Sequence, residues 1–336
     1  MPHSNISIFV PHYGCPNQCS FCNQNSITGL KTPLSLSEVK KTCEKAFNEI
    51  LDKSNTEIAF FGGSFTAINR EYMLSLLNTV SEFIGEGKFK GIRISTRPDC
   101  IDNEILSILK KNKVTAIELG VQSMDDYVLS QNDRGHTAEA VISAVKLIKQ
   151  YDFELGLQMM VGLYKSTPQL DIFTAEEIIK LSPDTVRIYP VVILTGTKLA
   201  TLFEKGEYIP YSIETAVEIC SKLIELFEIN NIKIIKLGLH ASELVESEMI
   251  GGIYHPAFKE LCYNRIYLDK ILSKISSLKS RNIIIHVPKN SISKVVGQKK
   301  SNIIALNNLG FSVKIIPSLR LKEYDIEIIE EETACT

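Results

Sequence analysis

Cys15-Pro16-Asn17-Gln18-Cys19-Ser20-Phe21-Cys22 decides how this chain is organised, and it follows shortly after the apolar run 6–10. Three thiols spaced C-x3-C-x2-C on one loop after a strand can ligate three irons of a [4Fe-4S] cluster, and no fourth cysteine follows at ferredoxin-like spacing. One iron would be left open to bind a substrate. We therefore predict that Cys15, Cys19 and Cys22 hold a cluster that takes part in chemistry.

Two other interpretations of these cysteines stay open. A structural zinc site normally uses four ligands, and His12 could supply the fourth; the thiols could also be unligated. A disulfide framework is not expected, since eight cysteines in 336 residues is not dense and nothing resembles a secretory signal. Most of the remaining cysteines are interpreted as small core residues. They are Cys43, Cys100, Cys220, Cys262 and Cys335.

The length and composition are those of a soluble protein larger than one typical domain. A (β/α) barrel of about 200–250 residues with a small appendage would account for 336 residues. Hydrophobic residues make up 44% and charged residues 23%, which is too polar for a membrane span. With no targeting segment visible, we expect a cytoplasmic protein without a membrane partner, where an oxygen-sensitive cluster survives best.

The net charge of -2 is unevenly distributed along the chain. From Lys259 to Lys322 there are thirteen Lys and Arg residues against two acids, a local balance of +11, so the remainder carries -13. This asymmetry indicates a polyanion partner at the basic end.

Apolar strand-like runs alternate with amphipathic helix-like segments before this basic end. The sequence predicts strands over 6–10, 58–61, 91–95, 116–123, 154–163, 185–190 and 232–237. It predicts helices over 35–51, 72–84, 101–111, 138–150, 168–180 and 213–229, with a loop at 191–197. Such alternation indicates parallel strands with right-handed crossovers. We therefore expect an α/β fold, a partial or complete (β/α) TIM-type barrel whose reactive face lies at the carboxyl ends of the strands.

Several glycines and polar residues fall at those strand ends. Gly62 and Gly63, followed by Ser64, allow close approach of a ligand because no Cβ intervenes, although a Gly pair alone is more often a turn. Glu118 and Gln122 interrupt an otherwise apolar strand, and a buried charge is costly unless it is partnered. A structural salt bridge could explain Glu118, but its position in a barrel favours ligand contact.

With Phe21 directly before the third cysteine, the cysteine stretch resembles the signature of radical S-adenosylmethionine (radical SAM) enzymes. Further strings narrow the resemblance: Phe61-Gly62-Gly63-Ser64-Phe65, Ser95-Thr96-Arg97-Pro98-Asp99, Glu118-Leu119-Gly120-Val121-Gln122-Ser123, Arg134-Gly135-His136-Thr137, Arg187-Ile188-Tyr189-Pro190 with Gly196-Thr197, and Lys205-Gly206-Glu207-Tyr208 with Pro210-Tyr211. In this order they resemble the radical SAM core of the elongator catalytic-subunit family, which modifies the wobble uridine of tRNA. The match covers roughly residues 5–265.

The resemblance implies a partial radical SAM barrel that uses a [4Fe-4S] cluster and SAM. It implies that the three cysteines ligate the cluster as catalytic residues and that Gly62, Gly63 and Ser64 hold the methionine moiety. The implied contacts to the rest of the cofactor are Phe21, Thr96, Glu118, Gln122 and Arg134. His136 would face the substrate or cofactor, or would only support the next helix start, and Tyr189 would line the cavity.

One part of the family pattern is missing. Family members abstract hydrogen from the acetyl group of acetyl-CoA and carry a C-terminal acetyltransferase-like domain. Only about 70 residues follow Asp269, too few for that fold. Acetyl-CoA as co-substrate is therefore not implied, whereas SAM cleavage is.

The basic end of the chain resembles a minimal KH domain, giving a predicted small C-terminal α/β KH-like domain. The sequence predicts a strand over 283–288, helices over 291–296 and 301–309, and two further strands over 311–316 and 324–329. The KH fold clamps nucleic acid with a G-x-x-G loop between its two helices. Here the loop reads Gly297, Gln298, Lys299 and Lys300, so a lysine replaces the second glycine and adds phosphate attraction. The alternative is a small cap with a solvated basic face.

Together these features predict residues 1–265 as a radical SAM core with its C-terminal extension and 281–332 as a KH-like RNA-binding domain. The hypothesis is a radical SAM enzyme acting on RNA, most plausibly tRNA, with an electron donor such as flavodoxin or ferredoxin. One alternative is a peptide or small-metabolite substrate, and another is a non-enzymatic iron–sulfur module that binds RNA.

Overall fold

The structure, a computed structural model, describes residues 4–10, 15–23, 34–239 and 243–331. Its contacts divide the chain into two compact units. The first unit comprises Met1–Ser212 and Leu226–Tyr254, and the second comprises Ile213–Glu225 and His255–Thr336. These units do not coincide with the two predicted domain ranges, which stay a prediction.

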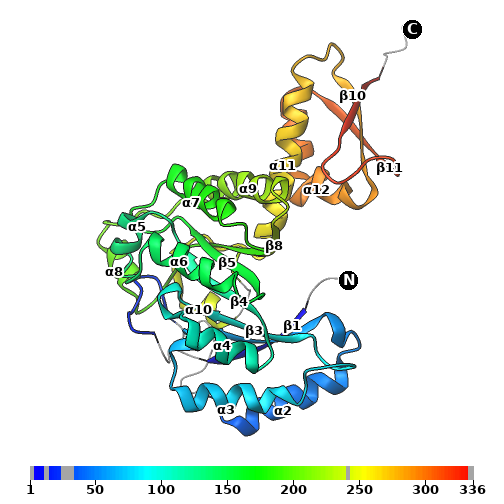
Figure 1. The fold of residues 1–336 in the computed structure, drawn as a ribbon. Coiled ribbons are helices and arrows are strands. Elements are labelled where there is room, and N and C mark those ends of the chain that lie inside the picture. The colour runs from blue at the N-terminus through cyan, green and yellow to red at the C-terminus, as the bar shows by residue number, and fades with distance from the viewer. Residues whose placement is uncertain (1–3, 11–14, 24–33, 240–242, 332–336) are drawn as a thin grey trace, which may run out of the picture. The chain divides into compact units, whose positions relative to one another are not determined.

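A seven-stranded parallel sheet forms the first unit, in the order β1-β2-β3-β4-β5-β6-β8 (Figure 1). Its strands are β1 (Ser4–Val10), β2 (Thr56–Gly62), β3 (Gly91–Thr96), β4 (Val114–Gln122), β5 (Glu154–Val161), β6 (Thr185–Pro190) and β8 (Lys233–Leu237). β1 and β8 are the two ends of the sheet, so the predicted α/β fold with a partial barrel is confirmed.

Helices connect successive strands of this half-barrel. They are α2 (Leu36–Glu49), α3 (Arg70–Ser81), α4 (Asn103–Lys111), α5 (Asp126–Gln131), α6 (Ala138–Ile148), α7 (Pro168–Lys180), α8 (Lys198–Glu204) and α9 (Ile213–Ile229). Side-chain caps fix where several of them begin, because they satisfy backbone N–H groups that have no helical partner. Ser35 forms a capping box with Glu38, and Thr137 caps α6.

Two predicted features are wrong in detail. Residues 191–197 are not only a loop, because β7 (Val192–Leu194) pairs antiparallel with β9 (Met249–Gly252), which follows α10 (Glu243–Glu248). Its partner lies far along the chain, so no local pattern reveals the pairing. The last strand, expected over 324–329, is β12 (Glu327–Glu330). Tyr324 has a positive φ of 68°, which excludes it from a strand.

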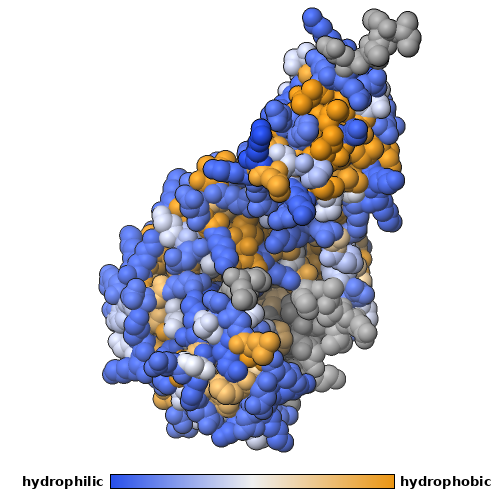
Figure 2. Space-filling view, turned by 90° about the vertical axis from the view of Figure 1, so that its right-hand side faces the viewer, coloured by the Kyte–Doolittle hydropathy of each residue, from blue (hydrophilic) through white to orange (hydrophobic). Residues whose placement is uncertain are grey.

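The second unit packs helices against one face of a three-stranded sheet. Helix α11 (Phe258–Ile275) precedes β10 (Asn282–Pro288), α12 (Ile292–Val296), α13 (Ser301–Asn308) and β11 (Ser312–Ser318). The order of the strands in this sheet is β11-β10-β12. In the hydrophobic core of the unit, Ile285 of β10 belongs to the same cluster of buried side chains as Tyr267 of α11 and Leu306 of α13. Hydrophobic side chains also gather on the face of this unit that Figure 2 turns to the viewer. The predicted element order is observed, whereas its interpretation as a KH-like domain stays a prediction.

Among the described helices, none combines the length and the apolar character that crossing a membrane requires.

Candidate active site

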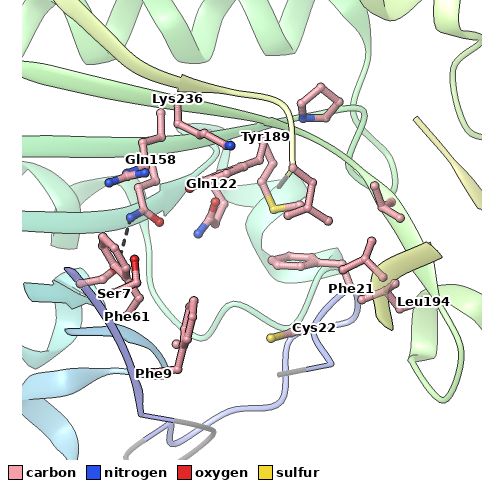
Figure 3. A pocket seen from close by; sticks show the side chains of 18 of the residues that line it. Ser7, Phe9, Phe21, Cys22, Phe61, Gln122, Gln158, Tyr189, Leu194 and Lys236 are labelled. Atoms are coloured by element: carbon pink, nitrogen blue, oxygen red, sulfur yellow. Dashed lines mark hydrogen bonds between the residues drawn. The ribbon is translucent and has the colours of Figure 1, made fainter. Parts of the chain in front are cut away.

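A cavity of about 660 Å³ lies inside the half-barrel, towards the carboxyl ends of its strands (Figure 3). Every strand of the seven-stranded sheet contributes to its wall, because alternate side chains of a strand point to the same face. The labelled residues that this sheet contributes to the wall are Ser7, Phe9, Phe61, Gln122, Gln158, Tyr189 and Lys236. The cysteine loop adds Phe21 and Cys22, so the loop and the strand ends enclose one space.

The cysteine loop is fastened to the barrel between two of its thiols. The Ser20 backbone N–H donates to the carbonyl of Asn132 at 3.1 Å, and the Ser20 hydroxyl donates to the Asn132 side chain at 2.8 Å. The Ser20 carbonyl accepts from the N–H of Leu199 at 2.8 Å. Ser20 and Asn132 are fully buried, so these bonds hold the middle of the loop in place.

The donor set of this loop suits an iron–sulfur cluster. The seven cysteines in the described ranges form no disulfide, so the thiols of Cys15, Cys19 and Cys22 are available for ligation. Thiolates are the usual ligands of such clusters. No three Cys, His, Asp or Glu side chains of the described ranges are already arranged around a metal position. Cluster ligation by the three cysteines therefore stays a prediction, and the zinc alternative involves His12, which lies outside the described residues.

A buried arginine links this loop to the tip of β4. Arg134 donates to the Cys19 sulfur at 3.1 Å and to the carbonyl of Gly120 at 2.5 Å. Its own carbonyl accepts from Arg97, whose guanidinium pairs with Asp99 at 2.8 Å. Hydrogen bonds and positive charge at a thiolate sulfur stabilise the anionic form and raise the reduction potential of a cluster. Arg134 is thus placed beside a predicted ligand, although direct cofactor contact stays a prediction.

The glycine tip of β2 approaches the end of β1. Gly62 lines the cavity at φ +114°, and a Cβ at this position would lie 2.7 Å from the Val10 carbonyl oxygen. The Gly63 N–H already donates to that carbonyl at 2.9 Å. Ser64 is buried and is not part of the cavity wall. Only the first residue of the predicted Gly62-Gly63-Ser64 motif thus reaches the cavity, and the methionine-binding role stays a prediction.

We expect Gly62→Ala to destabilise the first unit more than an alanine placed in open space at another glycine of positive φ. The methyl group would meet the Val10 carbonyl in a conformation that L residues rarely adopt. Gly206→Ala is the matched control, since φ is +74° there and nothing lies within 4 Å. We expect the control to cost about 1–2 kcal/mol, and thermal unfolding compares the two. An equal loss in both variants would contradict the close approach.

Gln122 has the features of a ligand-binding residue. It ends β4 at a register shift, has a positive φ of 68°, and lines the cavity. Its Oε1 atom is buried and has no hydrogen-bond partner among the described residues. A strained backbone and an unsatisfied buried acceptor are common in groups that a ligand completes, and cofactor contact by Gln122 stays a prediction.

Glu118 lies in a buried ion-pair cluster and not in the cavity wall. Arg187 donates two hydrogen bonds to its carboxylate at 2.5 and 2.8 Å, and Arg93 donates a third at 3.3 Å. Gln158 donates a fourth at 2.7 Å. These contacts match the salt-bridge alternative, and SAM contact by Glu118 stays a prediction. Thr96 likewise bonds to Thr66 at 2.6 Å and is absent from the cavity wall.

His136 is expected to remain neutral through the physiological pH range. Burial and the neighbouring Arg134 charge lower its pKa to about 4. Because this value lies below that of the unfolded chain, about 6.5, protonation favours unfolding, and stability falls as pH decreases from 6.5 towards 4. NMR titration of the imidazole tests this, with His136→Gln identifying the signal. An imidazole that titrates near pH 6.5 would contradict the burial described here.

Sequence reasoning missed Gln158, Arg187 and Lys236 as cavity residues. Each is a polar residue on a strand whose neighbours are apolar, the same signal that singled out Glu118 and Gln122. Tyr189 lines the cavity as predicted.

The comparisons with known proteins agree with this geometry. The family described as "Radical SAM superfamily" matches residues 9–171, and "Radical_SAM C-terminal domain" matches 183–267. The chain is 29% identical over 248 residues to the tRNA uridine(34) acetyltransferase of Methanocaldococcus jannaschii, covering 68% of this chain and 44% of the relative. It is 26% identical over 254 residues to Elongator complex protein 3 of Saccharomyces cerevisiae, covering 66% and 45%.

A solved structure of Methanocaldococcus infernus Elp3, truncated at its N-terminus, shares the fold with a TM-score of 0.62 and 21% identity. The match covers 80% of this chain and 63% of that one. The chain spans about half the length of the curated relatives that it matches.

The sequence matches both family descriptions, and the structure is a parallel half-barrel with a three-cysteine loop at the carboxyl ends of its strands. The chain therefore belongs to the radical SAM superfamily and is an enzyme of that class. Enzymes of this superfamily use a [4Fe-4S] cluster and SAM. Within the superfamily, its core is similar to that of the tRNA uridine(34) acetyltransferases and Elongator complex protein 3.

Proposed function

We propose that this enzyme cleaves SAM reductively and modifies an RNA substrate of the tRNA class. The observation that carries the RNA substrate is the +11 balance between Lys259 and Lys322, in a chain that is acidic elsewhere. The relative from Methanocaldococcus jannaschii is named a tRNA uridine(34) acetyltransferase, and this name supports the same substrate class.

The cysteine loop and the cavity residues have separate tasks in this proposal. Cys15, Cys19 and Cys22 would hold the cluster, which when bound supplies the electron that breaks the sulfonium bond of SAM. The Gly62 tip lets ligand atoms approach the backbone, and the Gln122 Oε1 accepts a hydrogen bond from the bound cofactor. The apolar side chains of Phe9, Phe21 and Phe61 exclude water from the reacting atoms. A small electron carrier such as flavodoxin or ferredoxin would supply the reductant, and the cytoplasm would be the compartment.

Two measurements test the proposal together. The reconstituted enzyme should form 5′-deoxyadenosine from SAM when reduced, and tRNA from a deletion strain should lack one modified nucleoside by mass spectrometry. SAM cleavage with an unchanged tRNA nucleoside profile would move the substrate to a peptide or small metabolite. Absence of 5′-deoxyadenosine would contradict the radical chemistry itself.

We predict that Lys299→Glu combined with Lys300→Glu weakens tRNA binding. Both lysines are exposed on the loop between α12 and α13. Losing two phosphate contacts should reduce the log–log salt slope of tRNA binding by about 2 units. Lys40→Glu with Lys41→Glu is the matched control, an exposed adjacent pair on α2. Equal affinity and slope for the loop variant and the wild type would exclude the loop from RNA contact.

A further inference from the structure

Three tyrosine rings form a stack in the second unit. Tyr263 and Tyr267 lie one turn apart on α11, and Tyr324 lies in the segment before β12. The Tyr324 ring is stacked on Tyr267 with centroids 5.8 Å apart and on Tyr263 at 6.2 Å, with interplanar angles of 26° and 21°. Tyr267 is fully buried, whereas Tyr263 and Tyr324 are only partly buried. We call Tyr263 and Tyr324 the tyrosine platform.

The backbone of Tyr324 is held in an uncommon conformation that places its ring. Its φ of 68° is rare for a bulky residue. Its N–H donates to the Tyr267 hydroxyl at 3.0 Å, and that hydroxyl donates to Ser291 at 2.7 Å. Packing inside the unit therefore fixes where the platform lies.

Lysine ammonium groups lie over the platform. Lys294 is 4.5 Å from the Tyr263 ring centroid, and Lys259 is 5.8 Å from it. Lys270 is 5.7 Å from the Tyr324 centroid. A lysine side chain is long and flexible, so its ammonium group can leave the ring face and contact a phosphate oxygen instead. Lys294 also pairs with Glu323 at 2.6 Å, a partly exposed contact of little strength.

The platform adjoins the loop that carries Lys299 and Lys300. Asn264, next to Tyr263 in sequence, accepts through its carbonyl from the Asn302 side chain at 2.8 Å. With its amide oriented to satisfy both ends, its Oδ1 accepts from the Gln298 N–H at 2.9 Å. Gly297 lets the loop pass close to the start of α13, because a Cβ there would lie 2.8 Å from the Asn302 backbone nitrogen. The loop is thus bound to the helix that carries the platform.

We propose that the tyrosine platform stacks unpaired bases of a single-stranded RNA segment, while Lys259, Lys270 and Lys294 contact its phosphates. This site rests on the proposed RNA substrate and extends it to residues outside the G-x-x-K loop. In the complex, bases replace the ammonium groups over the rings, and the ammonium groups pair with the flanking phosphates. Aromatic faces beside a basic groove are the combination by which proteins bind single strands. A duplex does not fit, because its bases are already stacked on one another.

The test titrates full-length, cluster-reconstituted protein with a fluorescein-labelled oligouridylate of about ten nucleotides, without reductant. We expect Tyr263→Leu to weaken binding by roughly 5- to 100-fold, as the loss of one base–aromatic stack does. Tyr263→Phe keeps the ring and should bind like the wild type. Because the chain contains no tryptophan, quenching of tyrosine emission on binding is a second readout, and it should diminish in Tyr263→Leu.

Tyr151→Leu is the matched control. Tyr151 is stacked on Phe153 at 6.4 Å, and Lys110 lies 5.1 Å from the Phe153 centroid, so it is a lysine-associated aromatic pair in the first unit. Its replacement should leave RNA affinity unchanged. Wild-type affinity in Tyr263→Leu, equal losses in both leucine variants, or equal affinity of the wild type for a duplex of the same length would each overturn the platform. Because this titration does not depend on SAM cleavage, its failure is distinguishable from failure of the radical chemistry.

Discussion

Replacing Cys22 with alanine is expected to reduce 5′-deoxyadenosine formation to background. Cys22 lines the cavity, and two remaining thiolates cannot hold a cluster in the predicted three-cysteine arrangement. Iron and sulfide content should fall together with SAM cleavage. Both are measured on reconstituted protein, the first by chemical assay and the second by mass spectrometry of the products.

The control for this experiment is Cys43→Ala. Cys43 is fully buried on α2, and burial raises its pKa to about 12, so it is a protonated thiol unsuited to ligation. The alanine variant should keep its iron and its SAM cleavage, at a modest cost in stability for the small cavity. If Cys22→Ala retained both cluster and product, the predicted ligand set would be wrong.

Replacing Arg93 with methionine is expected to destabilise the first unit by about 3–5 kcal/mol, the usual cost of leaving buried charges unpaired. Arg93 is fully buried and contacts Glu57 at 2.7 Å, Glu118 at 3.3 Å and Glu154 at 2.5 Å. Glu57 is also fully buried, so the variant removes the 2.7 Å partner of a carboxylate that water cannot reach, whereas Glu118 keeps its two hydrogen bonds from Arg187. The unfolding midpoint of this unit should fall by on the order of 10 °C.

Arg70→Met provides the comparison for this prediction. Arg70 pairs with Glu104 at 3.5 Å, but both side chains are substantially exposed, and such pairs contribute about 0–1 kcal/mol. Scanning calorimetry of the full chain measures both variants. A loss in Arg93→Met no larger than in Arg70→Met would show that the cluster is not a stabilising element. Adding Glu57→Gln to Arg93→Met should recover part of the loss, since it removes a buried carboxylate charge that has lost its 2.7 Å partner Arg93.

The strands of the half-barrel and the position of the cysteine loop could be predicted because their signals are local. Parallel strands buried on both faces read as continuous apolar runs, and Ser35 and Thr137 mark helix starts within a few residues. The short β7 could not be predicted, since its partner β9 follows after a long intervening segment.

The residues that pair with Glu118 could also not be predicted from the sequence. Arg93 and Arg187 come from different strands, and only the register of β3, β4 and β6 decides that they meet at one carboxylate. Burial and polarity indicated that Glu118 needed a partner, but they could not distinguish an arginine of the barrel from a ligand. Gln122 is also a polar residue in an apolar strand, but it lines the cavity. It lies at the register shift at the end of β4.

The attachment of Ser20 to Asn132 and Leu199 bears on how the enzyme matures. Fixing the backbone of one residue costs about 1–2 kcal/mol in conformational entropy. At the centre of the loop, this entropy is already lost when the barrel folds. Iron and sulfide would therefore meet a loop whose centre, at Ser20, is already ordered. Breaking the attachment, as in Asn132→Ala, would slow cluster insertion even where the finished cofactor is stable.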